Sequence, residues 1–313
     1  SNGQTFEPEP NLRCVFQGLP EQAHEPPAHD IYTETVSAGS QVPRLLNVPD
    51  EAVYRHEYVF VPHDVGEAQR RLKFLVGVEV HRTLAAHADP AVRQAVVPFY
   101  WACLVPGRSC GVTWIGRGSK INVTALTPAA VRSGVLQLWE ALAAMHQVAG
   151  VSHHDIKLQN VVMHGGRWKF IDFDNSRVET AAARPDATAT TERHVTFTTP
   201  EFYFQELIPG NTARPMFSLD VFMLAVLSCD VFCGGTAPRG DLVASIWAGR
   251  FEGERPTLAH CGHVLAQQLD AMVAADAVPA AFRPILRRAL APNPDDRPQA
   301  TDVLALLRNA APN

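Results

Sequence analysis

With 313 residues, the chain is long enough for one two-lobed domain, or two compact ones, with a sizeable buried core. Its 46% hydrophobic and 19% charged residues are typical of a globular protein, and no apolar run reaches the length of a membrane span. The formal net charge of -5 argues against a nucleic acid or an anionic membrane as the main partner.

The first third of the chain predicts strands with one helix. Residues 1–30 are rich in Pro, Glu and Gln, which indicates an extension that is at most partly ordered. A helical pattern of apolar residues runs from Gly66 to Ala86. Short apolar segments predict strands before and after it: Ile31–Val36, Arg44–Val48, Tyr58–Val61, Phe99–Val105 and Gly111–Ile115. Residues 31–118 are therefore expected to form a small β-rich lobe.

The remainder predicts a larger, mostly helical lobe over residues 119–313. A long helix is expected to begin at Thr127-Pro128 and to continue through His146. The segments Val161–Met163 and Trp168–Ile171 predict a hairpin, because glycines form the turn between them. From Ser218 onward the sequence is Ala-rich and helical in pattern.

The segment before this hairpin carries the most chemical information. It reads His153-His154-Asp155-Ile156-Lys157-Leu158-Gln159-Asn160. This resembles the protein-kinase catalytic loop H-R-D-x-K-x-x-N, with His154 in place of the usual arginine. In that loop the Asp155 position accepts the proton of an attacking hydroxyl, Lys157 neutralises the transferring phosphoryl group, and Asn160 holds Mg²⁺.

A second motif follows at the expected distance. Asp172-Phe173-Asp174 resembles the D-F-G motif, with Asp174 in place of glycine. The resemblance makes Asp172 the second candidate ligand for Mg²⁺, beside Asn160. For Asp174 two roles are open, a turn cap and a cation ligand, and turn chemistry favours the first.

Three later segments complete the resemblance. Thr199-Pro200-Glu201 is similar to the A-P-E motif, and Ser218–Phe222 to the start of the central helix, whose Asp220 would brace the catalytic loop. Asn293–Pro298 contains an arginine, Arg297, at the position that pairs with the A-P-E glutamate. We therefore expect a buried Glu201–Arg297 ion pair. The resemblance to the protein-kinase superfamily implies an α+β fold with two lobes.

Two phosphate-handling parts of a kinase are absent from the small lobe. No glycine lies between Gly39 and Gly66, so the glycine-rich loop that covers the phosphates is missing. No lysine precedes Lys73. The strand lysine, which anchors the α- and β-phosphates, is therefore missing too.

The replacement for that lysine stays open among Arg55, His56 and Lys73. Lys73 falls inside the predicted helix, where the simpler interpretation is a solvated side chain. Glu79 is the helix glutamate best placed to pair with an anchoring lysine.

The chain has six cysteines and no C-x-x-C pair, so a zinc site is not expected. Cys103 and Cys110 flank a turn and form the candidate local disulfide; the alternative is six reduced thiols. Asn122 begins an N-x-T glycosylation triplet.

A kinase-like chain without the glycine loop is similar to the With-No-Gly-loop branch of the secreted rhoptry-type kinases of apicomplexan parasites. The resemblance implies secretion into the parasitophorous vacuole. Two functions follow. The first is a pseudokinase with little or no ATP binding and no cofactor. It would act as a scaffold or allosteric partner of another protein, such as a kinase or a protein of the vacuolar membrane or wall. The second is an active, atypical Ser/Thr kinase that uses ATP and Mg²⁺. The absent lysine favours the first, whereas the retained Asp155, Asn160 and Asp172 favour the second.

Overall fold

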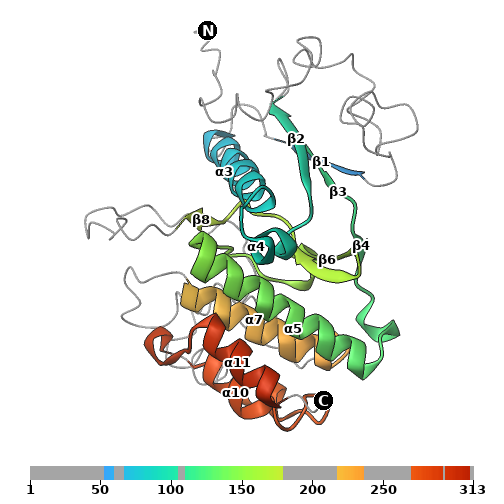
Figure 1. The fold of residues 1–313 in the computed structure, drawn as a ribbon, viewed down its shortest axis with the longest axis vertical. Helices are drawn as coiled ribbons and strands as arrows, with labels where there is room; N and C mark the ends of the chain where they lie inside the picture. Colours follow the sequence, from blue (N-terminus) through green and yellow to red (C-terminus); the bar gives the residue numbers. More distant parts are fainter. Residues whose placement is uncertain are drawn as a thin grey trace, which may run out of the picture.

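A computed structural model describes residues 53–59, 67–104, 110–178, 217–235, 269–291 and 293–310. The fold is mixed α and β, as predicted. Figure 1 shows a strand-rich part with one long helix in the upper half and a group of helices below it. The predicted strands at Ile31–Val36 and Arg44–Val48 lie outside the described residues, as does the predicted extension over residues 1–30.

Three antiparallel strands form the first sheet, in the order β1-β3-β2: β1 (Val53–Val59), β2 (Phe99–Leu104) and β3 (Cys110–Gly116). The strand predicted from Tyr58 begins five residues earlier, at Val53, because β1 pairs with β3 along its whole length. This register places the Cα atoms of Arg55 and His56 opposite those of Trp114 and Thr113.

Helix α3 (Glu67–Ala85) packs against this sheet and confirms the predicted helix to within one residue at each end. Phe74 of α3 lies directly over Gly111 of β3, where a Cβ atom would overlap the ring. A short helix, α4 (Pro90–Ala95), follows and was not predicted. Its start is nonetheless encoded locally, since the Asp89 side chain accepts a hydrogen bond from the Ala91 backbone N–H at 2.7 Å.

A second small sheet has the order β4-β6-β7: β4 (Ser119–Lys120), β6 (Val161–His164) and β7 (Arg167–Phe170). The predicted hairpin is confirmed. Gly165 and Gly166 turn it with φ angles of 58° and 74°, which glycine adopts without a steric penalty.

Helices α5 (Pro128–Ala144), α7 (Phe217–Phe232), α10 (Arg283–Ala289) and α11 (Ala300–Ala310) form the helical part. Thr127 caps α5 by accepting a hydrogen bond from the Ala130 N–H at 3.2 Å. The core lies between α5 and α7, where the buried Trp139 indole donates to Ser228 Oγ at 3.1 Å. No helix in the described ranges is long and apolar enough to cross a membrane.

Short elements connect these parts. They are η5 (Val123–Ala125), the π-helical η6 (Met145–Ala149), β5 (Val151–Ser152), η7 (Leu158–Asn160), β8 (Arg177–Val178) and η8 (Pro294–Asp296). Gly150 ends η6 in the left-handed region, with φ 64°, and turns the chain toward the catalytic-loop motif.

Candidate functional site

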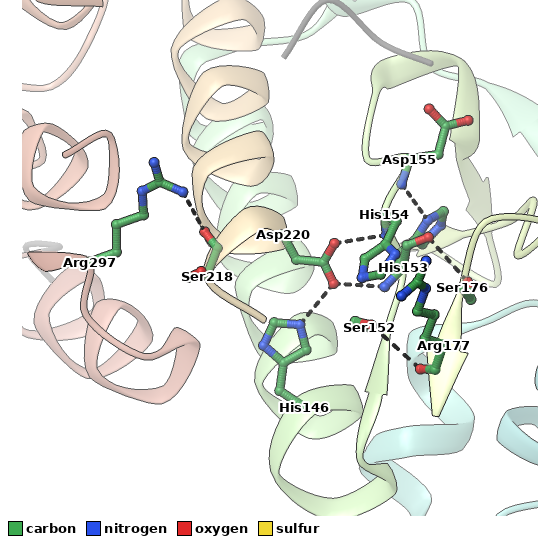
Figure 2. A network of polar contacts seen from close by, with 10 residues as sticks. All are labelled: His146, Ser152, His153, His154, Asp155, Ser176, Arg177, Ser218, Asp220 and Arg297. Atoms are coloured by element: carbon green, nitrogen blue, oxygen red, sulfur yellow. Dashed lines mark hydrogen bonds and ion pairs between the residues drawn. The ribbon is translucent and has the colours of Figure 1, made fainter. Parts of the chain in front are cut away.

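The two motifs with chemical content are held side by side by a short strand pair. β5 precedes the catalytic-loop motif, β8 follows the D-F-D motif, and the two strands pair antiparallel. Ser176 Oγ donates to the His153 carbonyl at 3.2 Å, which adds a contact between the motifs (Figure 2). Residues 153–160 and 171–176 are therefore fixed relative to each other.

Asp220, on the first turn of α7, holds the backbone of the catalytic loop in place and is called the brace below. Its fully buried carboxylate accepts hydrogen bonds from the backbone N–H groups of His153, at 2.7 Å, and His154, at 2.8 Å (Figure 2). His146 Nε2 lies 3.0 Å from the same carboxylate. Burial would raise the pKa of Asp220, but the His146 hydrogen bond and the neighbouring histidines leave it below its usual value.

This brace holds an unfavourable backbone conformation. His154 has φ 63°, in the left-handed region that residues with a side chain rarely adopt. The hydrogen bonds that the backbone N–H groups of His153 and His154 donate to Asp220 offset the conformational penalty. The resemblance to kinases predicts that Asp220 braces the catalytic loop, and in the structure its carboxylate contacts the backbone of that loop.

Three residues of the catalytic-loop motif meet at one carboxylate. Asp155 Oδ2 accepts from Lys157 Nζ at 2.7 Å and from Asn160 Nδ2 at 2.9 Å. Asn160 Nδ2 also lies 2.9 Å from the Asp155 carbonyl. The other oxygen, Asp155 Oδ1, is buried and has no hydrogen-bond partner among the described residues. It therefore keeps an acceptor lone pair for a proton.

A column of rings joins the loop to α3. Phe173 is buried, with its ring centroid 4.9 Å from that of His153 and 5.2 Å from that of His81 on α3. His81 in turn lies 5.5 Å from Phe99 of β2 and is 2.9 Å from the Val97 carbonyl through Nε2. Burial lowers the pKa of His81 to about 4. Asp172, beside Phe173, has a left-handed φ of 67°.

Lys73 reaches into this site from α3, so its interpretation as a solvated side chain is wrong. Its Nζ donates to Asn175 Oδ1 at 3.0 Å, and the side chain is half-buried. Burial lowers the pKa of Lys73, while three carboxylates raise it by attraction: Asp174, Asp155 and Asp172. A positive charge from the helix therefore stands beside the negative charges of both motifs.

Glu79 points to a different partner from the one that the kinase pattern implies. Its carboxylate pairs with Arg82 on the same helix, with Arg82 Nη2 at 2.6 Å. The α3 residue that faces the D-F-D motif is Gly77, where a Cβ atom would overlap Asp174 Oδ1. Lys73, Gly77 and His81 follow each other at four-residue intervals. This spacing was the available signal that they share one face of the helix.

Arg297 is buried, as expected for the late arginine motif. Its Nε donates to the Ala291 carbonyl at 2.7 Å. Its Nη1 donates to the Ser218 carbonyl at 3.1 Å (Figure 2). The guanidinium carbon lies 4.6 Å from the centre of the Phe222 ring, and burial lowers the pKa of Arg297 to about 10. Glu201 lies outside the described residues, so the ion pair with Arg297 stays a prediction.

The cysteines give no disulfide in the described part of the chain. Neither Cys229 nor Cys233 is part of a disulfide, and burial raises the pKa of the Cys229 thiol to about 12. The strand register places Cys103 opposite Val112 and Cys110 opposite Val59. Neither side chain of that candidate pair is described, so their disulfide stays a prediction.

Asn160 and Asp172 stay the predicted ligands for Mg²⁺. Within the described ranges, no three His, Cys, Asp or Glu residues are arranged to hold a metal ion. The Asn160 amide nitrogen donates to Asp155, so its amide oxygen is the atom that would hold the cation, and the Lys73 ammonium attracts the Asp172 carboxylate.

Comparison with known proteins gives the family of the chain. A comparison with curated proteins found no match. The family model of the protein kinase domain matches residues 117–306, more than half of the chain. The matched region contains the catalytic loop, the D-F-D motif, Asp220 and Arg297, and the chain belongs to the protein kinase family.

Proposed function

We propose that this kinase-family chain is a pseudokinase, which binds ATP weakly or not at all and acts as a scaffold or allosteric partner of another protein. One observation carries the proposal: strand β1, which directly precedes the α3 helix, reads VYRHEYV and has no lysine. In kinases the phosphate-anchoring lysine comes from the strand before that helix.

The basic residues near this position are poor substitutes. Arg55 and His56 are the two in β1, and a planar guanidinium or a weakly basic imidazole does not reproduce a compact ammonium. Lys73 has an ammonium but is hydrogen-bonded to Asn175 and surrounded by carboxylates. Loss of such an electrostatic anchor removes several kcal/mol of transition-state stabilisation.

Two contacts that give a kinase its shape are nonetheless present in the described ranges. The brace at Asp220 and the ring column through Phe173 need neither nucleotide nor metal for their contacts. A preformed surface loses little conformational entropy on association, which favours the binding of a protein partner. The proposed partner is a protein such as a kinase, or a protein of the vacuolar membrane or wall.

The second candidate function is an active, atypical Ser/Thr kinase, which the catalytic loop itself favours. Asp155 is oriented by Lys157 and Asn160, and its Oδ1 remains without a partner in the described part of the chain. That oxygen would accept the proton of a substrate hydroxyl, and Lys157 would stabilise the negative charge that develops. ATP and Mg²⁺ would be required cosubstrate and cofactor.

We also propose membership of the With-No-Gly-loop branch of rhoptry-type kinases and, from it, secretion into the parasitophorous vacuole. The missing strand lysine supports a likeness to the bradyzoite pseudokinase of that branch. Asn122 is exposed, and Thr124 Oγ1 donates to its Oδ1 at 2.8 Å, so the glycosylation triplet lies on the surface. Mass spectrometry of the unreduced protein from parasites tests this compartment: a glycan at Asn122 or a Cys103–Cys110 bond supports it, and six free thiols without a glycan contradict it.

Radiolabelled phosphotransfer onto a generic substrate tests the pseudokinase proposal, with Asp155→Asn as the control. We expect equal background in both proteins, and no rise in melting temperature with ATP and Mg²⁺, because a bound ligand would stabilise the fold by mass action. Strong wild-type activity that Asp155→Asn abolishes would establish the second candidate instead. Lys73→Met, compared with Lys169→Met, would then show whether Lys73 anchors the phosphates.

A further inference from the structure

The edge of the site that α3 forms contains a glycine where contact is closest. A Cβ atom at Gly77 would overlap Asp174 Oδ1 and would stand 3.2 Å from the Asp174 backbone nitrogen and Cα. Real Cβ atoms essentially never come within 3.0 Å of a non-bonded heavy atom, so a side chain at position 77 requires Asp174 to move. Gly77 and Asp174 are thus sterically matched.

The positive charge on this edge of the site belongs to Lys73, one helical turn before Gly77 in α3. Lys73 lies four residues before Gly77, on the same helix face, and donates to Asn175, the neighbour of Asp174, at 3.0 Å. Among the carboxylates that attract the Lys73 ammonium, Asp174 has the largest effect. The helix therefore carries the positive group, and the loop after β7 carries the negative one.

In kinases the helix carries a glutamate, which pairs with the strand lysine, and the third residue of the D-F-G motif is an uncharged glycine. In this chain the helix carries Lys73, and the motif carries Asp174. We propose that Lys73 and Asp174 form an exchanged ion pair that joins α3 to the catalytic loop, and that Gly77 provides the space for it. Asp174 is then a positioning residue rather than the turn cap favoured by the sequence.

The exchanged pair would hold α3 against the loop with no bound nucleotide. Kinases use their helix glutamate to orient the lysine that binds ATP, so that pair serves the ligand. Here Lys73 contacts Asn175 and Gly77 faces Asp174 across the α3–loop contact, beside the ring column of Phe173 and His81. This inference does not depend on whether the protein transfers phosphate.

A steric double-mutant cycle on the full chain tests the match between Gly77 and Asp174. Gly77→Ala should lower the melting temperature of the wild type, because the new methyl group displaces Asp174. In the Asp174→Gly background, the same substitution should lower the melting temperature much less, since the overlap with Oδ1 is gone and alanine favours a helix by about 1 kcal/mol relative to glycine. A fall of equal size in both backgrounds would overturn the proposed match.

An electrostatic cycle tests the ion pair itself. Lys73→Met should lower the melting temperature by roughly 2–4 °C, and Asp174→Asn in the same chain should recover at least half of that loss. The interaction between the two sites should shrink at about 1 M salt, a response that loss of packing alone does not give. Additive effects, or an interaction that does not change with salt, would contradict the ion pair.

Lys169→Met is the matched control for Lys73→Met. Lys169 is also half-buried and donates to a single oxygen, the Val96 carbonyl, at 3.0 Å. We expect Asp174→Asn not to recover stability in the Lys169→Met protein. Recovery there as well would show a general stabilisation by Asp174→Asn and would overturn the assignment. Phosphotransfer by the wild type would refute the pseudokinase proposal but would leave both cycles unchanged.

Discussion

The catalytic loop and the α3 edge of the site meet at Phe173, and they relate to the kinase pattern in different ways. In the loop, the motif residues keep the partners that the pattern implies: Asp220 binds two backbone N–H groups, and Asp155 is oriented by Lys157. On the α3 edge, a glycine faces the D-F-D motif, and Lys73 brings a positive charge to it.

The difference teaches which contacts in this fold can be exchanged. A buried carboxylate that binds the backbone has no alternative partner, because the two N–H groups are present in any sequence and must be satisfied. A half-buried pair of side chains can be rebuilt from neighbouring positions if the charges and the volume still match. The following predictions test this contrast, beginning with the largest expected effect.

Asp220→Ala should destabilise the fold most. It leaves two buried backbone N–H groups and the buried His146 ring without their acceptor, and it releases the left-handed His154. We expect a loss of about 3–5 kcal/mol in the free energy of unfolding, measured by urea denaturation. Asp270→Ala, which removes an exposed carboxylate paired with Arg287, should change it by less than about 1 kcal/mol. Similar losses in the two variants would refute the role of Asp220 as a brace.

Acid should weaken both regions, because each contains a buried neutral histidine. Burial lowers the pKa of His81 on α3 and of His154 in the loop to about 4, below the ordinary value of 6.5. Between these two pKa values, each imidazole takes up a proton only in the unfolded chain. The contribution of the two histidines to the free energy of unfolding is therefore complete above pH 6.5 and falls as pH decreases toward 4. The expected loss is about 2 kcal/mol for each imidazole at about pH 5.

Urea denaturation from neutral pH to about pH 5 measures this loss, and His81→Leu separates the two regions. The variant removes a titrating group but keeps an apolar side chain against Phe173, so its stability should depend less steeply on pH. An unchanged slope would place the acid sensitivity elsewhere in the chain.

Arg297→Lys should have an intermediate effect. A lysine keeps the charge but cannot hold both the Ala291 and Ser218 carbonyls while lying over Phe222. We expect a loss of about 1–3 kcal/mol, against almost none for Arg288→Lys, whose arginine is exposed. Combination with Glu201→Gln tests the predicted ion pair: the two effects should be less than additive if the side chains touch.

Glu140→Gln should have the smallest effect. The carboxylate joins three elements, since it accepts from Arg167 of β7 at 2.7 Å and from Arg308 of α11 at 2.8 Å. Burial would raise the pKa of Glu140, but the two arginines together lower it. Because the site is partly exposed, we expect a loss of about 0.5–1 kcal/mol that diminishes in high salt. A loss as large as that of Asp220→Ala would remove the distinction between exposed charge pairs and the buried brace.

The sequence by itself determined the parts whose signal is local. The α3 helix, the hairpin at Gly165-Gly166 and the order of the kinase motifs could be predicted, because periodicity, turn residues and motif spacing act over a few residues. The candidate catalytic residues Asp155, Lys157 and Asn160 belong to this group, since a single loop brings them together.

Only the tertiary structure decided which groups meet across the site. Lys73 contacts Asn175 although 102 residues separate them, and Gly77 faces Asp174 at a similar separation in sequence. The contact of Arg297 with Ser218 was likewise decided by the packing of α7 against η8 rather than by the motif around Arg297. Local spacing places a side chain on a face of its helix, but the packing of the helix against the loop selects what that face touches.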